Sequence, residues 1–476
     1  MIGLVVSRAD DASVAIGEAL RSLVDWEELT DDTRSDADGG GTYYRHGDFE
    51  LRTFDAWHLE LADVADAFSA APEFVAFLSR HAGDTGPLLT AHFTGNFGPA
   101  EYGGEPGELA RTCPNVQREA LSAFDRHAPE GYEVGVECTH HGPTDVGAPS
   151  LFVELGSSES EWSDPEGARA VARSVLELSG VDADAGPGGD APGENRQIVG
   201  FGGGHYAPQV ERLLRETDWR VGHVAADWVR KSMGAPAANA AVIERAFEQS
   251  AATRALVAGD DPDLEAVLDD LGYRVVDETW LQVTSGVPLD LVDALEGALG
   301  PIDDGVRLGD PAARASEAAI DPDFAVVSLP DDLLGAASGI DRDATFDAVA
   351  AHALAFETVE GGTKPRGRAA VAEEATVDDL VDALCSVLES KYDAVERSGD
   401  DVVATRETFD PAAAAEAGVP EGPAFGRLSA GESVEVADRT VRPEDVRTTE
   451  QVTLAAAVPV IDVDLGSERD SRADSA

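Results

Sequence analysis

Histidine is scarce in this chain, at ten of 476 residues, so the positions it occupies are informative. His92, His140, His141 and His205 each lie close to the end of a short apolar run that is typical of a β-strand, next to glycine-containing segments. In open α/β sheets, ligand-binding and catalytic groups collect just beyond the carboxyl ends of strands. These imidazoles are therefore candidates for one shared site, although sequence alone does not show convergence.

Neutral imidazoles combined with a carboxylate are typical of catalytic zinc sites, which keep one coordination position open for water. Glu137 and Glu154 are carboxylates close to these histidines in the sequence. A structural role is the alternative: His140–His141 could be packing residues, and His205 could cap a helix. We interpret the remaining histidines as structural, and among them His81 has the most suggestive context because it ends a strand.

Gly202–Gly204 join a predicted strand to a predicted helix. Free N–H groups at a helix start attract phosphate or carboxylate, although a glycine turn needed only for tight packing fits equally well. No Gly-Lys-Ser/Thr follows, which excludes a P-loop, and neither HExxH nor GxSxG occurs in the chain. The basic cluster Lys364–Arg368 is either a phosphate contact or a solvated loop.

The chain carries 92 acidic and 35 basic residues, a formal net charge of −57, yet 43% of its residues are hydrophobic. A core is therefore expected despite the charge. Such acidity is typical of proteins from a salt-loaded cytosol, where the Debye length falls to roughly 3 Å at 1 M salt. Simple electrostatic binding of nucleic acid is disfavoured, because it requires lysine and arginine to displace counterions.

The three cysteines are widely spaced and form no CxxC pair, so neither a disulfide framework nor thiolate zinc is expected. The first residues are typical of a strand rather than a signal peptide, and no apolar stretch approaches roughly 18 residues. We therefore expect a cytoplasmic, reduced protein.

Strand-like and helix-like segments alternate over residues 1–300, which predicts one layered α/β domain. Within it, about 30–42 and 182–195 are predicted to be flexible insertions. An accessory acidic α/β region is expected over 301–464, followed by a disordered tail at 465–476.

Several motifs, in order along residues 1 to 280, resemble the archaeal-type D-aminoacyl-tRNA deacylase family, which plants share. The segments that carry this resemblance are Leu78–His81, Thr90–Asn96, Tyr102–Gly104, Thr139–Thr144, Phe152–Glu159 with Trp162, Gly200–Pro208, Val221–His223 and Val242–Ser250. The chain looks like a halophilic member with a C-terminal extension, since family members are usually much shorter. Phe93-Thr94 and Phe97 stand where the family pattern has Thr-Pro and Trp.

The resemblance implies a three-layer α/β/α fold related to phosphorylases and peptidyl-tRNA hydrolase, with an accessory C-terminal α/β region. It also implies hydrolysis of the ester that joins a D-amino acid to the 3′ end of tRNA, with Zn²⁺ as cofactor. The alternatives are a phosphorylase-like nucleoside or nucleotide enzyme, or a non-catalytic module that binds the tRNA end. We expect a monomer with neither a membrane nor a DNA partner.

The residues and the resemblance together predict the roles of individual side chains. The predicted catalytic residues are Glu137, Thr139, His140, His141 and His205. The predicted substrate-binding residues are His92, Asn96, Gly202, Gly203, Gly204 and Tyr206. The predicted metal ligands are drawn from His92, His140, His141, Glu154 and His205.

Overall fold

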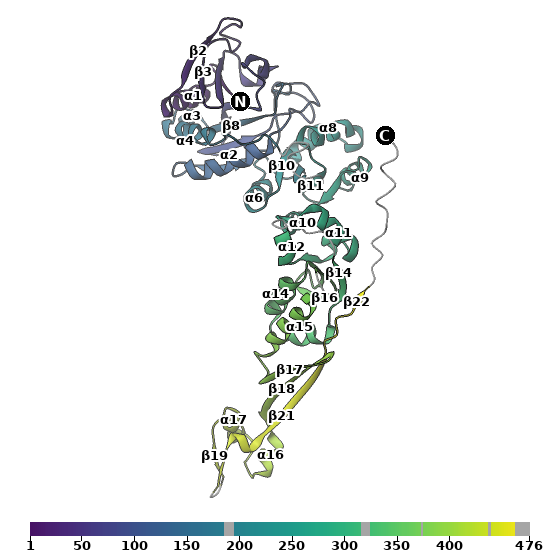
Figure 1. The fold of residues 1–476 in the computed structure, drawn as a ribbon. Coiled ribbons are helices and arrows are strands. Elements are labelled where there is room, and N and C mark those ends of the chain that lie inside the picture. Colours follow the sequence, from purple (N-terminus) through teal and green to yellow (C-terminus); the bar gives the residue numbers. More distant parts are fainter. Residues whose placement is uncertain (185–194, 316–323, 373–374, 437–438, 462–476) are drawn as a thin grey trace. The chain divides into compact units, whose positions relative to one another are not determined.

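The computed structural model describes residues 1–184, 195–315, 324–372, 375–436 and 439–461. The chain divides into two compact units, Met1–Ser285 and Gly286–Ala476 (Figure 1). The predicted disordered tail at 465–476 and most of the predicted insertion at 182–195 lie outside the described residues.

A large mixed sheet organises the first unit. Among the described residues, eight strands pair in the order β2-β3-β4-β1-β5-β8-β6-β7. Their bounds are β1 (Ile2–Ser7), β2 (Glu27–Asp31), β3 (Gly41–His46), β4 (Phe49–Phe54), β5 (Phe74–Ala82), β6 (Leu88–His92), β7 (Glu133–Val136) and β8 (Ser150–Ser157). Strands β4, β1, β5 and β8 run parallel, whereas β6 runs antiparallel to β8 and parallel to β7. The mixed α/β architecture is as predicted.

Helices cover one face of this sheet. They are α1 (Asp11–Leu23), α2 (Pro114–His127) and α4 (Pro165–Leu176), with the short α3 (Glu159–Trp162) beside them (Figure 1). The start of α1 is set by Asp10, whose side chain accepts the N–H groups of Ala12 and Ser13. Because side chains alternate along a strand, Leu4 packs under the helices while Val5 faces a second apolar cluster on the other side of the sheet.

A smaller parallel sheet completes the first unit, with strand order β10-β9-β11-β12. Its strands are β9 (Gln197–Phe201), β10 (Arg220–Ala225), β11 (Arg254–Val257) and β12 (Arg274–Val276). The helices of this part are α6 (Pro208–Glu216), α7 (Asp227–Met233), α8 (Ala240–Ser250), α9 (Pro262–Asp270) and α10 (Glu278–Thr284).

Two backbone hydrogen bonds join this sheet to the segment that follows β7. The N–H of Cys138 donates to the carbonyl of His205, and the N–H of Thr139 donates to the carbonyl of Val224, each at 2.8 Å. These bonds bring the loop after β9 beside His140, so residues far apart in the sequence become neighbours.

The segment 30–42 differs from the predicted flexible loop. Thr30 pairs with Thr42 at the antiparallel junction of β2 and β3, so both ends of the segment are strands. The buried Arg52 anchors it, because its guanidinium donates to the carboxylate of Asp31 at 2.7 Å and to the carbonyl of Gly39 at 2.8 Å. Alternating apolar residues are scarce here, which is why the sequence did not indicate strands.

The second unit begins earlier than the predicted change near residue 300. The helix before that position, α11 (Leu289–Leu299), belongs to this unit because Arg368 donates to the carbonyls of Ala298 and Leu299. The basic cluster Lys364–Arg368 is a strand rather than a solvated loop, and Arg368 also pairs with Glu357. A phosphate contact by its exposed Arg366 stays a prediction.

Antiparallel sheets organise the second unit, in the orders β13-β15-β16-β14-β22, β17-β18-β21 and β19-β20. Its strands are β13 (Val306–Leu308), β14 (Ala325–Ser328), β15 (Ala355–Val359), β16 (Lys364–Val371), β17 (Ala394–Ser398), β18 (Asp401–Phe409), β19 (Val434–Val436), β20 (Arg439–Val441), β21 (Arg447–Ala455) and β22 (Val460–Ile461). Its other helices are α12 (Asp310–Arg314), α13 (Asp331–Ser338), α14 (Arg342–His352), α15 (Ala375–Leu388), α16 (Pro411–Glu416) and α17 (Pro423–Ser429). In the described parts of both units, no helix has the length and apolar character needed to span a membrane.

His223, on β10, is a buried structural histidine, as expected from the sequence. Its Nε2 donates to the carbonyl of Ala110 at 2.9 Å, and its Nδ1 accepts the hydroxyl of Thr139 at 3.0 Å. Both partners suit the neutral ring, and burial lowers the pKa of His223 to about 4.

Replacing His223 should therefore change how stability responds to acid. Above the ordinary pKa of 6.5 the ring is neutral in both the folded and the unfolded chain. As the pH falls toward 4, the unfolded chain binds the proton first, so the wild type loses roughly 3 kcal/mol of stability through this group. His223→Gln should lack that loss, measured by urea unfolding at several pH values in molar KCl. Parallel stability curves for the two proteins would contradict this role.

Candidate active site

The histidines singled out from the sequence converge in the first unit. The ring centroid of His140 lies 4.3 Å from that of His92, 4.4 Å from that of His141 and 4.8 Å from that of His205. They come from the end of β6, the segment after β7 and the loop after β9.

The antiparallel direction of β6 places His92 over the middle of the sheet. In the strand register His92 is paired with Phe152, and the two rings stack with centroids 5.2 Å apart. His92 therefore does not lie at a shared carboxyl edge of β6 and β8, as parallel strands would have required. The fully buried β8 also carries Glu154, two residues beyond Phe152 and on the same face.

The ring orientation of three histidines leaves the same nitrogen available on each. The Nδ1 atoms of His92, His140 and His141 lie 3.1, 2.8 and 2.6 Å from backbone carbonyl oxygens. A carbonyl oxygen can only accept, so each Nδ1 carries a proton, and whenever the ring is neutral the lone pair lies on Nε2. Among the described residues, the buried Nε2 of His92 has no hydrogen-bond partner.

These three histidines form a group whose potential ligand atoms all lie within 4.8 Å of one another. Burial and the nearby charge of His92 lower the pKa of His140 to about 4, and burial lowers the pKa of His141 well below its ordinary value. Metal ligation requires the neutral ring, and a ligating histidine characteristically donates its other N–H to a carbonyl or carboxylate. Burial disfavours the charged ring of His92, but Glu154 outweighs burial and raises the pKa of His92, so this ring must give up a proton to become a ligand. With that proton displaced, the three side chains fit a zinc ion.

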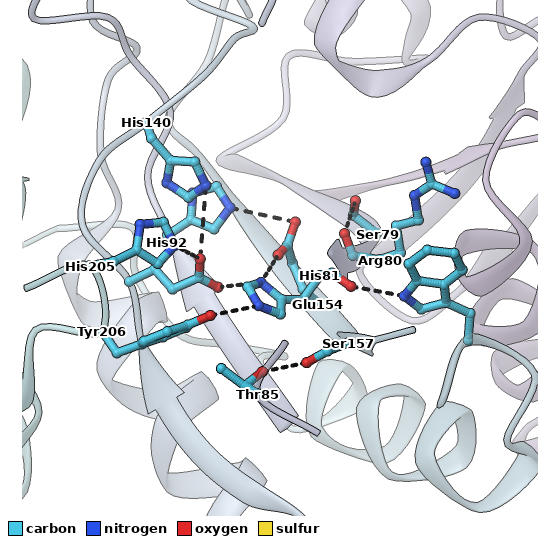
Figure 2. Close-up of polar contacts among 12 residues, drawn as sticks. Ser79, Arg80, His81, Thr85, His92, His140, Glu154, Ser157, His205 and Tyr206 are labelled. Atoms are coloured by element: carbon cyan, nitrogen blue, oxygen red, sulfur yellow. Dashed lines mark hydrogen bonds and ion pairs between the residues drawn. The ribbon is translucent and has the colours of Figure 1, made fainter. Parts of the chain in front are cut away.

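His81, which the sequence indicated to be structural, occupies the centre of a second cluster. Its Nδ1 lies 3.1 Å from Glu137 and 3.5 Å from Glu154, and its Nε2 lies 3.0 Å from the hydroxyl of Tyr206 (Figure 2). Burial disfavours the charged ring, but contacts with the two carboxylates outweigh burial and raise the pKa of His81 to about 11. Its position at a strand end, in Ser-Arg-His, was the available sequence signal.

His205 pairs with Glu137 on the other side of this cluster. Its Nε2 lies 2.7 Å from the Glu137 carboxylate, and its Nδ1 lies 3.6 Å from the sulfur of Cys138. Burial and the charge of Glu137 raise the pKa of the Cys138 thiol to about 12, so the thiol stays protonated and is a poor nucleophile. The His205–Glu137 pair can hold and move protons without a covalent intermediate on cysteine.

Two cavities meet at the histidines. The larger, about 730 Å³, is also lined by Arg80, His81 and Glu154, and the smaller, about 260 Å³, by Thr139 and Trp228. His140, His141, His205 and Tyr102 line both.

Aromatic side chains stand at the edge of this space. Tyr102 is 67% exposed, Trp228 49% and Tyr206 37%. The site thus combines a buried polar floor with an exposed aromatic rim.

Comparisons with known proteins show the family to which this chain belongs. A family model described as D-aminoacyl-tRNA deacylase matches residues 68–276. A relative named D-aminoacyl-tRNA deacylase from Haloquadratum walsbyi is 50% identical over 95% of each chain. One of the same name from Natronomonas pharaonis is 54% identical over 94% of this chain and 98% of its own. The chain belongs to the D-aminoacyl-tRNA deacylase family.

A solved structure supports the α/β fold. It is described as a conserved protein of unknown function, AF0625, and is 26% identical with a TM-score of 0.51. The match covers 59% of this chain and 96% of that chain. The halophilic family members match far more, 94–95% of this chain, so the region beyond residue 300 is shared with them rather than being an addition to this one.

Of the other predicted site residues in this family member, some support the site and others lie away from the two cavities. Asn96 donates to the carbonyls of Gly103 and Glu105, so it shapes a loop of the smaller cavity. The hydroxyl of Thr139 is used by His223 and by the N–H of Val224.

The glycine turn lies apart from both cavities. None of the described residues that line them belongs to Gly202–Gly204, and the N–H of Gly202 is already donated to Ala225 at 2.8 Å. A role for Gly203 and Gly204 in binding substrate stays a prediction.

The backbone of His141 lies in the left-handed region, with φ +45°. Side chains other than glycine pay about 1–2 kcal/mol there, a strain characteristic of functional sites. His141→Ala and His141→Gly remove the same imidazole, but only glycine relieves the strain. His141→Gly should therefore be more stable than His141→Ala by about 1 kcal/mol in urea unfolding. Equal stability, or a more stable alanine variant, would show that the backbone here is unstrained.

Proposed function

We propose that this protein hydrolyses the ester bond of D-aminoacyl-tRNA, releasing the free D-amino acid and tRNA. The observation that carries the proposal is the buried cluster of histidines and carboxylates between two cavities, in a chain whose relatives carry the deacylase name. An aminoacyl ester needs a water that loses a proton and a ribose oxygen that gains one, and the cluster contains groups suited to both.

We propose that His92, His140 and His141 hold a zinc ion through their Nε2 atoms. Glu154 is the nearby carboxylate, 3.5 Å from the Nε2 of His92. When bound, zinc supplies a Lewis acid and lowers the pKa of a coordinated water.

The His205–Glu137 pair is suited to proton transfer. The side chain of His205 is 31% exposed and lines both cavities, whereas Glu137 is buried and holds the ring in place. His205 can therefore accept a proton from water and later deliver it to the ribose oxygen, while Glu137 stabilises the charged ring. His81 fills the other side of Glu137 and keeps that carboxylate ionised: burial opposes this, but His205 and His81 hold the pKa of Glu137 well below its ordinary value.

The exposed aromatic rim suits the unpaired 3′ end of tRNA. Bases of single-stranded nucleic acid stack on aromatic side chains, and stacking does not depend on counterion release. Tyr102, Tyr206 and Trp228 can therefore bind the substrate end in molar salt, where long-range attraction is screened. This reconciles a polyanionic substrate with a chain of net charge −57. A monomeric state, a cytoplasmic location and the absence of DNA binding stay predictions.

The test is incubation with matched D- and L-aminoacyl-tRNA in molar KCl, with and without a chelator. We expect hydrolysis of the D substrate only, and loss of activity after chelation that Zn²⁺ restores. Equal hydrolysis of both substrates, or of neither, would exclude the proposed function. Turnover that requires inorganic phosphate would instead indicate a phosphorylase, and binding without turnover a tRNA-end binding module.

Variants of two neighbouring histidines separate the proposed role in binding zinc from the proposed role in proton transfer. His140→Ala should lose both bound zinc, measured by metal analysis of the purified protein, and deacylation. His205→Ala should keep the zinc while kcat falls about 10²- to 10⁴-fold. A His140→Ala protein with full zinc content and wild-type kcat would show that this ligand set is wrong. Loss of zinc from His205→Ala would show that His205 is a zinc ligand.

A further inference from the structure

Arg80 is held between aromatic rings rather than carboxylates. The guanidinium carbon lies 4.4 Å from the ring centroid of Trp57 and 4.5 Å from that of Trp162. Among the described residues, no carboxylate forms an ion pair with this guanidinium and no protein group accepts a hydrogen bond from it. That is unusual in a chain where acidic residues outnumber basic ones by 92 to 35.

The position of Arg80 is fixed by its neighbours on β5. Its backbone N–H donates to the buried carboxylate of Asp10 at 3.0 Å, and the indole N–H of Trp162 donates to the carbonyl of His81 at 2.8 Å. Trp162, one of the two rings that hold the cation, is thus hydrogen-bonded to the end of β5 that carries His81. Indole rings stabilise a cation without neutralising it, so its N–H groups stay available for an acceptor.

Arg80 lines the larger cavity together with His140 and His205. Among the described residues that line the two cavities, it is the single lysine or arginine. Its guanidinium points away from the ring of His81 (Figure 2), so the cation and the histidine cluster face different parts of one space of about 730 Å³.

We infer that Arg80 binds the phosphate on the 5′ side of the terminal nucleotide of the substrate. The inference rests on the proposed function. In an aminoacyl-tRNA the ester is attached to the terminal ribose, and the phosphate on the 5′ oxygen of the same ribose is the adjacent anion. A guanidinium can donate two parallel hydrogen bonds to a phosphate, a short-range contact that survives in molar salt. Arg80 is therefore a specificity residue that positions the nucleotide while the histidines act on the ester.

The first experiment compares substrates with and without this phosphate, in molar KCl. The probes are the D-aminoacyl ester of adenosine and that of adenosine 5′-monophosphate. Arg80→Gln should raise KM for the phosphorylated ester and for D-aminoacyl-tRNA about 10- to 100-fold, with kcat nearly unchanged. The phosphate-free ester should be unaffected, and Arg80→Lys should lie between Gln and wild type for the phosphorylated substrates.

Arg21 provides a matched control. It also lies over an aromatic ring, that of Tyr44 at 5.1 Å, but lines neither cavity, so Arg21→Gln should leave KM for every substrate unchanged. An equal rise in KM for both esters in Arg80→Gln, or a loss confined to kcat, would mean that Arg80 only supports the fold, and would overturn the inference.

A binding measurement separates this inference from the proposed function. Calorimetry should show adenosine 5′-monophosphate binding the wild-type protein more tightly than adenosine, with the difference lost in Arg80→Gln. If the wild type deacylates D-aminoacyl-tRNA but binds the two ligands equally, the role of Arg80 is wrong and the function stands. If it binds them as expected but deacylates nothing, the function is wrong and Arg80 remains a phosphate-binding residue.

Discussion

The buried carboxylate of Glu137 constrains the whole candidate site. A charge at that depth is costly unless it is paired, and its partners are His205 at 2.7 Å and His81 at 3.1 Å. These partners come from the loop after β9 and from the end of β5, so the charge is compensated only when the two sheets of the first unit are joined. The backbone bonds from Cys138 and Thr139 to the smaller sheet make that junction immediately beside the carboxylate. Packing, charge compensation and ring orientation therefore depend on one another.

The net charge of −57 is compatible with a polyanionic substrate because charge repulsion acts over longer distances than the contacts that would bind the substrate. Molar salt screens charges separated by more than roughly 3 Å, so the acidic surface neither repels tRNA strongly nor attracts cations in an ordered way. Short-range contacts are unaffected, and those proposed here are stacking on Trp228 and hydrogen bonds from Arg80, which lies between two indole rings. Aromatic side chains and one arginine at the cavities are consistent with recognition of nucleic acid by short-range contacts in such a solvent.

The strand and helix positions around the site could be predicted from local sequence pattern. The choice of His92, His140 and His205 as candidates also came from that pattern, because strand ends beside glycine can be recognised in the sequence. The convergence of these rings was not visible, since it depends on β6 running antiparallel to β8. His81 was undervalued for the same reason: its two carboxylate partners lie more than fifty residues away along the chain. The strands at the ends of the segment 30–42 were missed because they are held by Arg52, a residue outside that segment.

The sequence by itself determined the family, the α/β class and the set of histidines and carboxylates available for chemistry, because motifs, periodicity and residue types are properties of the chain. Only the tertiary structure decided what each of them can do. A carbonyl placed against Nδ1 makes Nε2 the potential ligand atom on His92, His140 and His141. Burial keeps His140 and His141 neutral, whereas two carboxylates keep His81 charged. Tautomer and protonation state depend on neighbours a few ångströms away, and those neighbours come from distant parts of the chain.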